Sequence, residues 1–143
     1  MATVFSLLCQ VCGLSQSEAA RLLDARLDTI KSWSSGRRHA PGDAIEQLAE
    51  LAAAIDAAAD EAVDHIVAQA DAMGSNPEAI ELGLAADDHE ARGLGWPCVG
   101  AHRAVLALTV ARGMAEGFNF NIVPRGSTVA TAASADVHDR HKK

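Results

Sequence analysis

The feature that most constrains the fold is the segment from residue 43 to about residue 73, which contains neither proline nor glycine. Its apolar side chains recur at three- and four-residue spacing, which predicts one long amphipathic helix or two in line. At 1.5 Å per residue such a helix reaches roughly 45 Å, so we expect its far half to pack beyond a small N-terminal bundle. The apolar positions are Ile45, Leu48, Ala52, Ile55, Ala59, Ala62, Ile66 and Met73.

The composition favours helices in the rest of the chain as well. Of the 143 residues 49% are hydrophobic but only 3% are aromatic, and alanine is abundant. Helices tolerate small unbranched side chains, whereas strands favour bulky or branched ones. The length allows one domain or two small ones. We therefore expect a mainly α protein and exclude an all-β fold.

Neither a membrane span nor a metal site is expected. No apolar run is long enough to cross a bilayer and no basic leader precedes the first apolar residues, so we expect a cytoplasmic protein. The three cysteines cannot all pair, and we expect them to be reduced core residues. Cys9 and Cys12 form a C-x-x-C motif, but zinc needs further ligands at matching spacing. We expect no metal and no cofactor.

The net charge of −7 is distributed unevenly along the chain. Residues 1–42 hold five basic and three acidic side chains, whereas residues 43–92 hold thirteen acidic side chains and one arginine. Binding to a polyanion depends on the local field at the contact face, which salt screens within about 8 Å. The basic N-terminal region therefore remains able to bind nucleic acid.

Residues 5–35 contain signals for three short helices. The first covers residues 5–12, and Ser15 followed by Glu18 is a capping box that starts the second. Asp24 and Ala25 form the turn before a third helix, which runs through residues 29–33 and stops at Gly36. Two short helices joined by a tight turn are what a reader of the DNA major groove requires.

The stretch Leu14-Ser15-Gln16-Ser17-Glu18-Ala19-Ala20, then Thr29-Ile30-Lys31-Ser32-Trp33-Ser34-Ser35-Gly36, then Pro41, resembles the Cro/C1 (Xre-type) helix-turn-helix repressors over roughly residues 3–55. Two positions depart from that family's pattern. Asp24 replaces the usual turn glycine, which is a mild change because aspartate tolerates a left-handed conformation. Arg26 replaces the small polar cap of the third helix, and Asp28 is an alternative cap.

The resemblance implies roles for exposed residues of these helices. Gln16, Arg37 and Arg38 would contact backbone phosphates, and the first turns of the third helix would read bases. For Asp28 a capping role is as plausible as a base contact. For Lys31 and Ser32 the alternative to a base contact is that they belong to a solvated face of the helix. Trp33 is expected in the core together with Ile30. The predicted DNA-contacting residues are Gln16, Arg26, Asp28, Thr29, Lys31, Ser32, Ser35, Arg37 and Arg38.

The segment from residue 74 to residue 124 predicts a strand-helix-strand unit. Residues 78–84 and 118–123 alternate like strands, residues 87–95 read as a polar loop, and a helix runs from Trp96 and Pro97 to about Glu116. This helix is apolar nearly all round, so we expect it to be buried against a second copy of the chain. The predicted dimerisation residues are Trp96, Val99, Val105, Leu106, Leu108, Val110, Met114, Phe118, Phe120 and Ile122.

The predicted organisation has three parts. Residues 1–73 form a helix-turn-helix bundle of about five helices that includes the long helix, residues 74–124 form the dimerisation region, and residues 125–143 form a disordered tail. A Gly-Trp pair before an apolar helix also gives the second part a looser resemblance to anti-CRISPR-associated (Aca-type) phage and plasmid repressors. That resemblance implies a homodimer that represses its own operon from a palindromic operator on double-stranded DNA.

The sequence also bears on three other function classes: an enzyme, an antitoxin and a module for protein contact. The chain has no glycine-rich phosphate loop, no G-x-S-x-G motif and no tyrosine, which disfavours an enzyme. An antitoxin that binds its operator and also neutralises a basic toxin partner through its acidic middle is the main alternative. A helix-turn-helix used only for protein contact is the third.

Overall fold

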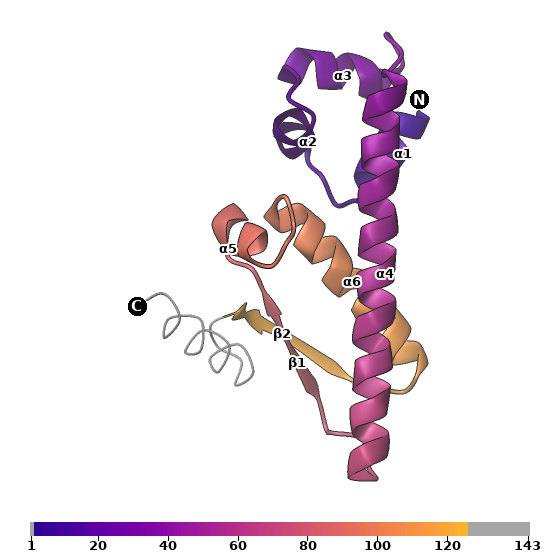
Figure 1. Ribbon diagram of the computed structural model, residues 1–143, viewed down its shortest axis with the longest axis vertical. Coiled ribbons are helices and arrows are strands. Elements are labelled where there is room, and N and C mark those ends of the chain that lie inside the picture. Colours follow the sequence, from indigo (N-terminus) through magenta and orange to yellow (C-terminus); the bar gives the residue numbers. More distant parts are fainter. Residues whose placement is uncertain (1, 126–143) are drawn as a thin grey trace.

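The computed structural model describes residues 2–125, so most of the predicted tail lies outside the described residues. The described chain is mainly helical with a small two-stranded sheet, which confirms the predicted fold class. Four helices, rather than about five, precede residue 74 (Figure 1). The elements are α1 (Val4–Val11), α2 (Gln16–Leu22), α3 (Leu27–Ser35), α4 (Gly42–Met73), β1 (Ile80–Leu84), α5 (Asp88–Gly93), α6 (Val99–Ala115) and β2 (Phe120–Pro124).

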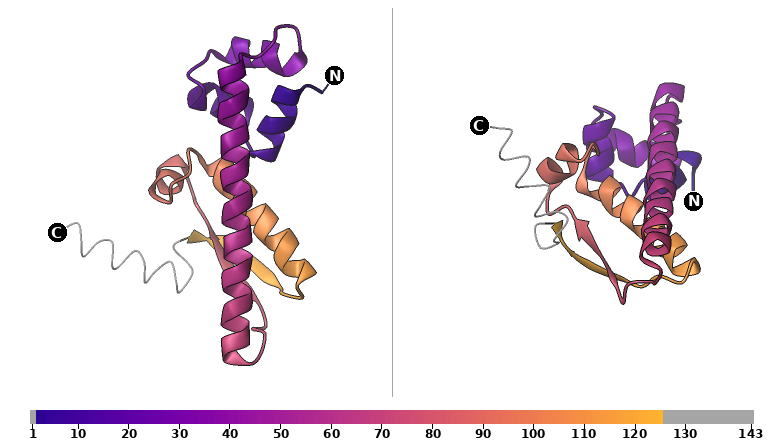
Figure 2. Two further views of the ribbon diagram at one scale, coloured as in Figure 1. Left: turned by 45° about the vertical axis from the view of Figure 1, so that its right-hand side comes forward. Right: turned by 60° about the horizontal axis from the view of Figure 1, so that its bottom comes forward.

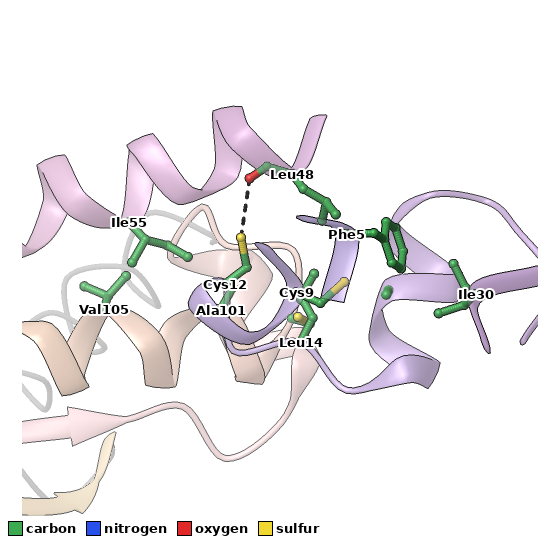
Figure 3. Packing of buried hydrophobic residues seen from close by; sticks show 11 residues of the cluster. Phe5, Cys9, Cys12, Leu14, Ile30, Leu48, Ile55, Ala101 and Val105 are labelled. Carbon is green, nitrogen blue, oxygen red and sulfur yellow. Dashed lines mark hydrogen bonds between the residues drawn. The ribbon is translucent and has the colours of Figure 1, made fainter. Parts of the chain in front are cut away.

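Helix α4 is the long helix that the sequence predicts, with 32 residues in one uninterrupted run. Helices α1 to α3 gather at its N-terminal end, and α6 packs along its later turns (Figures 1 and 2). Its buried side chains include Leu48 near the N-terminal bundle and Ile55, which lies close to Val105 of α6 (Figure 3). The far half of α4 is therefore packed by α6 of the same chain, whereas the sequence predicts that this apolar helix is buried against a second copy.

The capping signals are formed as predicted. Ser15 Oγ accepts a hydrogen bond from the Glu18 amide at 3.1 Å, and Glu18 Oε1 accepts one from the Ser15 amide at 2.9 Å. A second capping box, which the sequence reading did not identify, begins α1: Thr3 Oγ1 accepts from the Ser6 amide at 3.0 Å. Both boxes satisfy amides that a short helix otherwise leaves without partners.

The C-terminal part forms the predicted strand-helix-strand unit, with β1 and β2 paired in parallel. The prediction of a polar loop over residues 87–95 is wrong, because α5 lies there. Asp87 accepts a hydrogen bond from the Glu90 amide at 2.9 Å, and the Glu90 carboxylate accepts one from the Ala86 amide. This reciprocal capping allows a short helix to form in a polar segment.

All three cysteines are buried, as expected of core residues. Cys12 Sγ lies 3.4 Å from the carbonyl oxygen of Leu48, so its thiol donates to the backbone of α4 (Figure 3). Burial raises the pKa of Cys12 to about 11 and that of Cys98 to about 11. Both side chains are therefore neutral thiols at neutral pH, and they act as small apolar packing groups.

The N-terminal bundle and the strand-helix-strand unit meet at a close backbone contact. A Cβ on Gly100 of α6 would lie 2.2 Å from the carbonyl oxygen of Gly13, so only glycine fits. The Glu18 carboxylate, which caps α2, also accepts a hydrogen bond from the Gly100 amide at 3.0 Å. Burial opposes ionisation of Glu18, but these amide hydrogen bonds outweigh it and lower the pKa of the carboxyl. Glu18 thus joins the two parts of the chain.

None of the helices within residues 2–125 combines the length and the apolar character that a bilayer crossing needs.

Buried His102 on α6 makes the stability of this unit dependent on pH. Its Nδ1 accepts a hydrogen bond from the Ala85 amide at 3.1 Å, so that nitrogen carries no proton. Burial lowers the pKa of His102, and the nearby charge of Arg125 lowers it further against the opposing effect of Glu90. Unfolding therefore takes up a proton as the pH falls below the unfolded value of about 6.5.

We expect the free energy of unfolding to fall as the pH drops from about 6.5 through the lowered pKa, by at most about 1.4 kcal/mol per pH unit. Urea titrations at several pH values measure this. His102→Asn, whose Oδ1 can accept the same hydrogen bond without titrating, should lose the His102 part of the slope. An unchanged slope in that variant would assign the pH dependence to other groups.

Candidate nucleic-acid interface

The turn between α2 and α3 depends on the backbone conformation of Asp24, the residue that the sequence predicts in this turn. Asp24 has a φ of 50°, the left-handed conformation that the usual turn glycine would supply. Helix α3 then begins at Leu27, with Arg26 as the N-cap residue and no side-chain cap. Asp28 lies inside the first turn, so the alternative that it is the cap is wrong.

Two apolar side chains hold α3 against the bundle, as predicted. Ile30 is fully buried, and Trp33 packs edge-on against Phe5 of α1 with ring centroids 5.5 Å apart. The opposite edge of the helix faces outward at the end of the molecule farthest from the sheet (Figure 1). Its exposed side chains include Asp28, Lys31 and Ser35, whereas Thr29 is half-buried.

Ser32 does not lie where the sequence prediction puts it. Only 4% of it is exposed, and the side chain of Arg37 folds back onto it from the following loop. Nη2 of Arg37 donates a hydrogen bond to Ser32 Oγ at 2.7 Å. The serine hydroxyl therefore has a protein partner and is not a free group on the outer surface of α3.

The other predicted contacts are exposed around α3. Gln16 is the first residue of α2, Arg26 precedes α3, and Arg37 and Arg38 follow it. With Lys31 they give this end of the molecule four basic side chains. The carboxylate of Asp28 lies among them, so the surface combines general attraction for phosphates with one group that can accept from a base amine.

Two exposed residues at this end were not in the predicted set. Leu27 is 40% exposed at the start of α3, and His39 is exposed after the two arginines. An apolar side chain at the start of a recognition helix can contact a thymine methyl group. The signal for Leu27 was its position directly after the cap, which was missed because the helix was expected to start later.

The acidic side of α4 runs away from this surface, and part of it is engaged within the chain. Arg112 of α6 bridges Asp56 and Asp60, with Nη1 to Asp60 Oδ1 at 2.7 Å. Other acidic residues of α4 are exposed. They include Glu46, Glu50, Glu61, Asp64 and Asp71.

The predicted dimerisation residues divide into two groups. Val105 and Phe118 are buried in the protomer, so their assignment to a dimer surface is wrong. The apolar pattern of α6 is continuous around the helix and does not reveal which side faces the chain's own core. Trp96 and Leu108 pack against that core, and the ring of Phe120 lies against Gly113.

The second group remains accessible. Leu106 and Val110 of α6 line an open apolar hollow of about 380 Å³ with Leu84 and Ile122 of the sheet, and Arg103 lies at the same hollow. Ile122 is 49% exposed and Met114 is 58% exposed, while Val99 is half-buried. Contiguous exposed apolar surface can serve as an interaction site.

A scan against protein-family models and a search of curated proteins returned no match to this chain. Within residues 2–125 no three His, Cys, Asp or Glu side chains are grouped so that they could hold a metal ion. The interpretation of the surface around α3 therefore depends on its residues and their geometry.

Proposed function

We propose that the protein is a sequence-specific transcriptional repressor that binds double-stranded DNA in the cytoplasm and regulates its own operon. It acts as a binding protein and not as an enzyme. The observation that carries the proposal is the geometry of α3. Its apolar side is anchored by Ile30 and Trp33, and its polar edge is exposed among four basic side chains. An exposed helix of this kind can enter the major groove, whose width admits one α-helix.

The exposed residues divide into two roles. Asp28 and Lys31 are exposed on the outer edge of α3, and in this proposal they contact base edges, where a carboxylate accepts from cytosine and a lysine donates to guanine. Gln16 and Arg38 are exposed at the start of α2 and after α3, and in this proposal they contact phosphates, which fix the position of the helix in the groove. Ser35 lies on the same exposed edge, one turn after Lys31.

A homodimer completes the proposal. The open hollow between α6 and the sheet gives each chain an apolar surface that a second copy can cover, and Leu106, Val110 and Ile122 are among the residues that line it. A two-fold pair presents two α3 helices to one face of the duplex, and half-sites one turn apart are about 34 Å apart. Such a pair recognises an inverted repeat.

The antitoxin alternative has weaker support from the contacts. Asp56 and Asp60 of the acidic face are bound to Arg112 of the same chain, so they are not free to receive a basic partner. A single purification distinguishes the repressor from the antitoxin. A chain that is stable and dimeric alone supports the repressor, whereas co-purification of a stoichiometric basic protein supports the antitoxin.

Binding to DNA from the protein's own upstream region tests the function. If a dimer makes six to ten phosphate contacts, the affinity should fall by about 10³- to 10⁵-fold between 50 and 200 mM salt.

Arg38→Ala should weaken binding to all duplexes and reduce the salt slope by about 1 for each copy bound. Arg92→Ala is the matched control, because Arg92 is exposed on α5, a helix that lies below α2 while α3 lies above it (Figure 1). Binding that is absent, or that does not respond to salt, would overturn the proposal.

A further inference from the structure

The side chain of Arg37 is hydrogen-bonded to α3, although the residue belongs to the loop that follows this helix. It follows α3 in the sequence, yet its guanidinium lies back on the helix, where Nη2 donates to Ser32 Oγ at 2.7 Å. Ser32 is four residues after Asp28 and three before Ser35, so the three residues share one side of α3. Asp28 and Ser35 are exposed, whereas Ser32 is only 4% exposed. Because it is bonded to Ser32 Oγ, the guanidinium lies on this same side of α3.

The backbone after α3 holds Arg37 in this position. Gly36 has a φ of 82°, which reverses the chain at the end of the helix. The Arg38 amide then donates to the Ser32 carbonyl oxygen at 3.2 Å. Ser35 Oγ donates to the same carbonyl at 3.2 Å and lies 3.4 Å from the Arg37 amide. The loop is thus tied to the last turn of α3 on both sides of Arg37.

We propose that Arg37 is a specificity-determining residue that reads a guanine, and that Ser32 positions it. This inference rests on the proposed function and replaces the phosphate contact that the family resemblance implies for Arg37. A guanidinium has five N–H donors, of which one is used on Ser32. The remaining donors include the parallel pair that guanine O6 and N7 accept in the major groove. Because Ser32 already fixes the side chain, less conformational freedom is lost on binding.

Arg38 provides a matched comparison. It is the next residue, it carries the same charge and it is exposed, but its contact with α3 is made by its backbone amide. A phosphate contact by either arginine would act on every DNA sequence alike. A base contact by Arg37 acts only where the duplex carries the preferred base pair.

The experiment uses the full chain and a duplex pool with a randomised segment. Duplexes enriched by the wild-type protein should share a G·C pair at one fixed position of each half-site. Affinities are then measured for the enriched duplex and for its single base-pair substitutions, with wild type, Arg37→Lys, Ser32→Ala and Arg38→Lys. We expect Arg37→Lys and Ser32→Ala to lower discrimination at that pair by roughly 5- to 150-fold, because a bidentate pair contributes that much. Binding to random duplex should change by less than about twofold for both variants. Arg37→Lys keeps the positive charge, and Ser32→Ala replaces a side chain that carries no charge.

The outcomes separate this inference from the function on which it rests. If Arg37→Lys and Arg38→Lys change affinity equally for every duplex, Arg37 is a phosphate contact and the inference is wrong, while the repressor function stands. If the wild-type protein enriches no sequence from the pool, the proposed function itself is wrong. If Ser32→Ala keeps full discrimination while Arg37→Lys loses it, the positioning role of Ser32 is excluded.

Discussion

Val110→Lys is expected to separate the proposed homodimer and to lower affinity for the proposed operator by about 10²- to 10⁴-fold, the factor that is lost when two linked binding events become independent. Val110 lines the open hollow between α6 and the sheet, where Arg103 already contributes a positive charge. In a two-fold pair the substitution would place additional like charges in one apolar contact, where burial of an unpaired charge is costly.

Light scattering and operator binding measure the two effects on the same sample. Ala68→Lys is the matched control, because it adds the same charge at an exposed position of α4, a helix that contributes no residue to the hollow. The control should keep both the dimer mass and the operator affinity. A Val110→Lys protein that remains dimeric would place the interface elsewhere on the chain.

Gly100→Ala should lower the free energy of unfolding by about 1 to 3 kcal/mol, the usual cost of overpacking a closed contact. The new Cβ would lie 2.2 Å from the carbonyl oxygen of Gly13 and 2.6 Å from a Glu18 carboxylate oxygen. One of these neighbours is backbone and cannot rotate away. Separation of the two segments would also stretch the hydrogen bond from the Gly100 amide to Glu18.

Thermal unfolding measures this change, and we expect the midpoint to fall by roughly 3 to 12 °C. Gly93→Ala is the control, since a Cβ at that helical position meets nothing within 4 Å. It should leave the stability unchanged or raise it by up to about 1 kcal/mol, because alanine restricts the unfolded chain. Equal effects of the two substitutions would mean that the Gly13 and Gly100 contact does not hold the two parts together.

The sequence predicted those parts of the fold whose signals are local. The capping box of Ser15 and Glu18, the left-handed Asp24 and the glycine stop at Gly36 all depend on residues within a few positions of each other. The 32 residues of α4 were predicted from spacing and from the lack of helix breakers. Helix α5 was missed, because its start depends on side-chain capping in a polar segment and not on apolar spacing.

Contacts between distant segments could not be predicted in the same way. The hydrogen bond between Glu18 and Gly100 joins residues that no sequence period relates. The burial of Val105 depends on which side of an apolar helix meets α4, and a uniform pattern does not specify that side. The exposed side of α3 was predicted except at Thr29, which is half-buried, and at Ser32, which is buried and hydrogen-bonded to the side chain of Arg37.

The most direct test of the central claim is hydroxyl-radical footprinting of a DNA duplex bound by the full chain. The duplex is one that the protein has enriched from a random pool. A symmetric pair of α3 helices predicts two protected patches on one face of the duplex, about 34 Å apart and related by an inverted repeat. Arg38→Ala should weaken both patches equally. A single patch, two patches on opposite faces, or no protection at all would contradict the claim that paired α3 surfaces read the DNA.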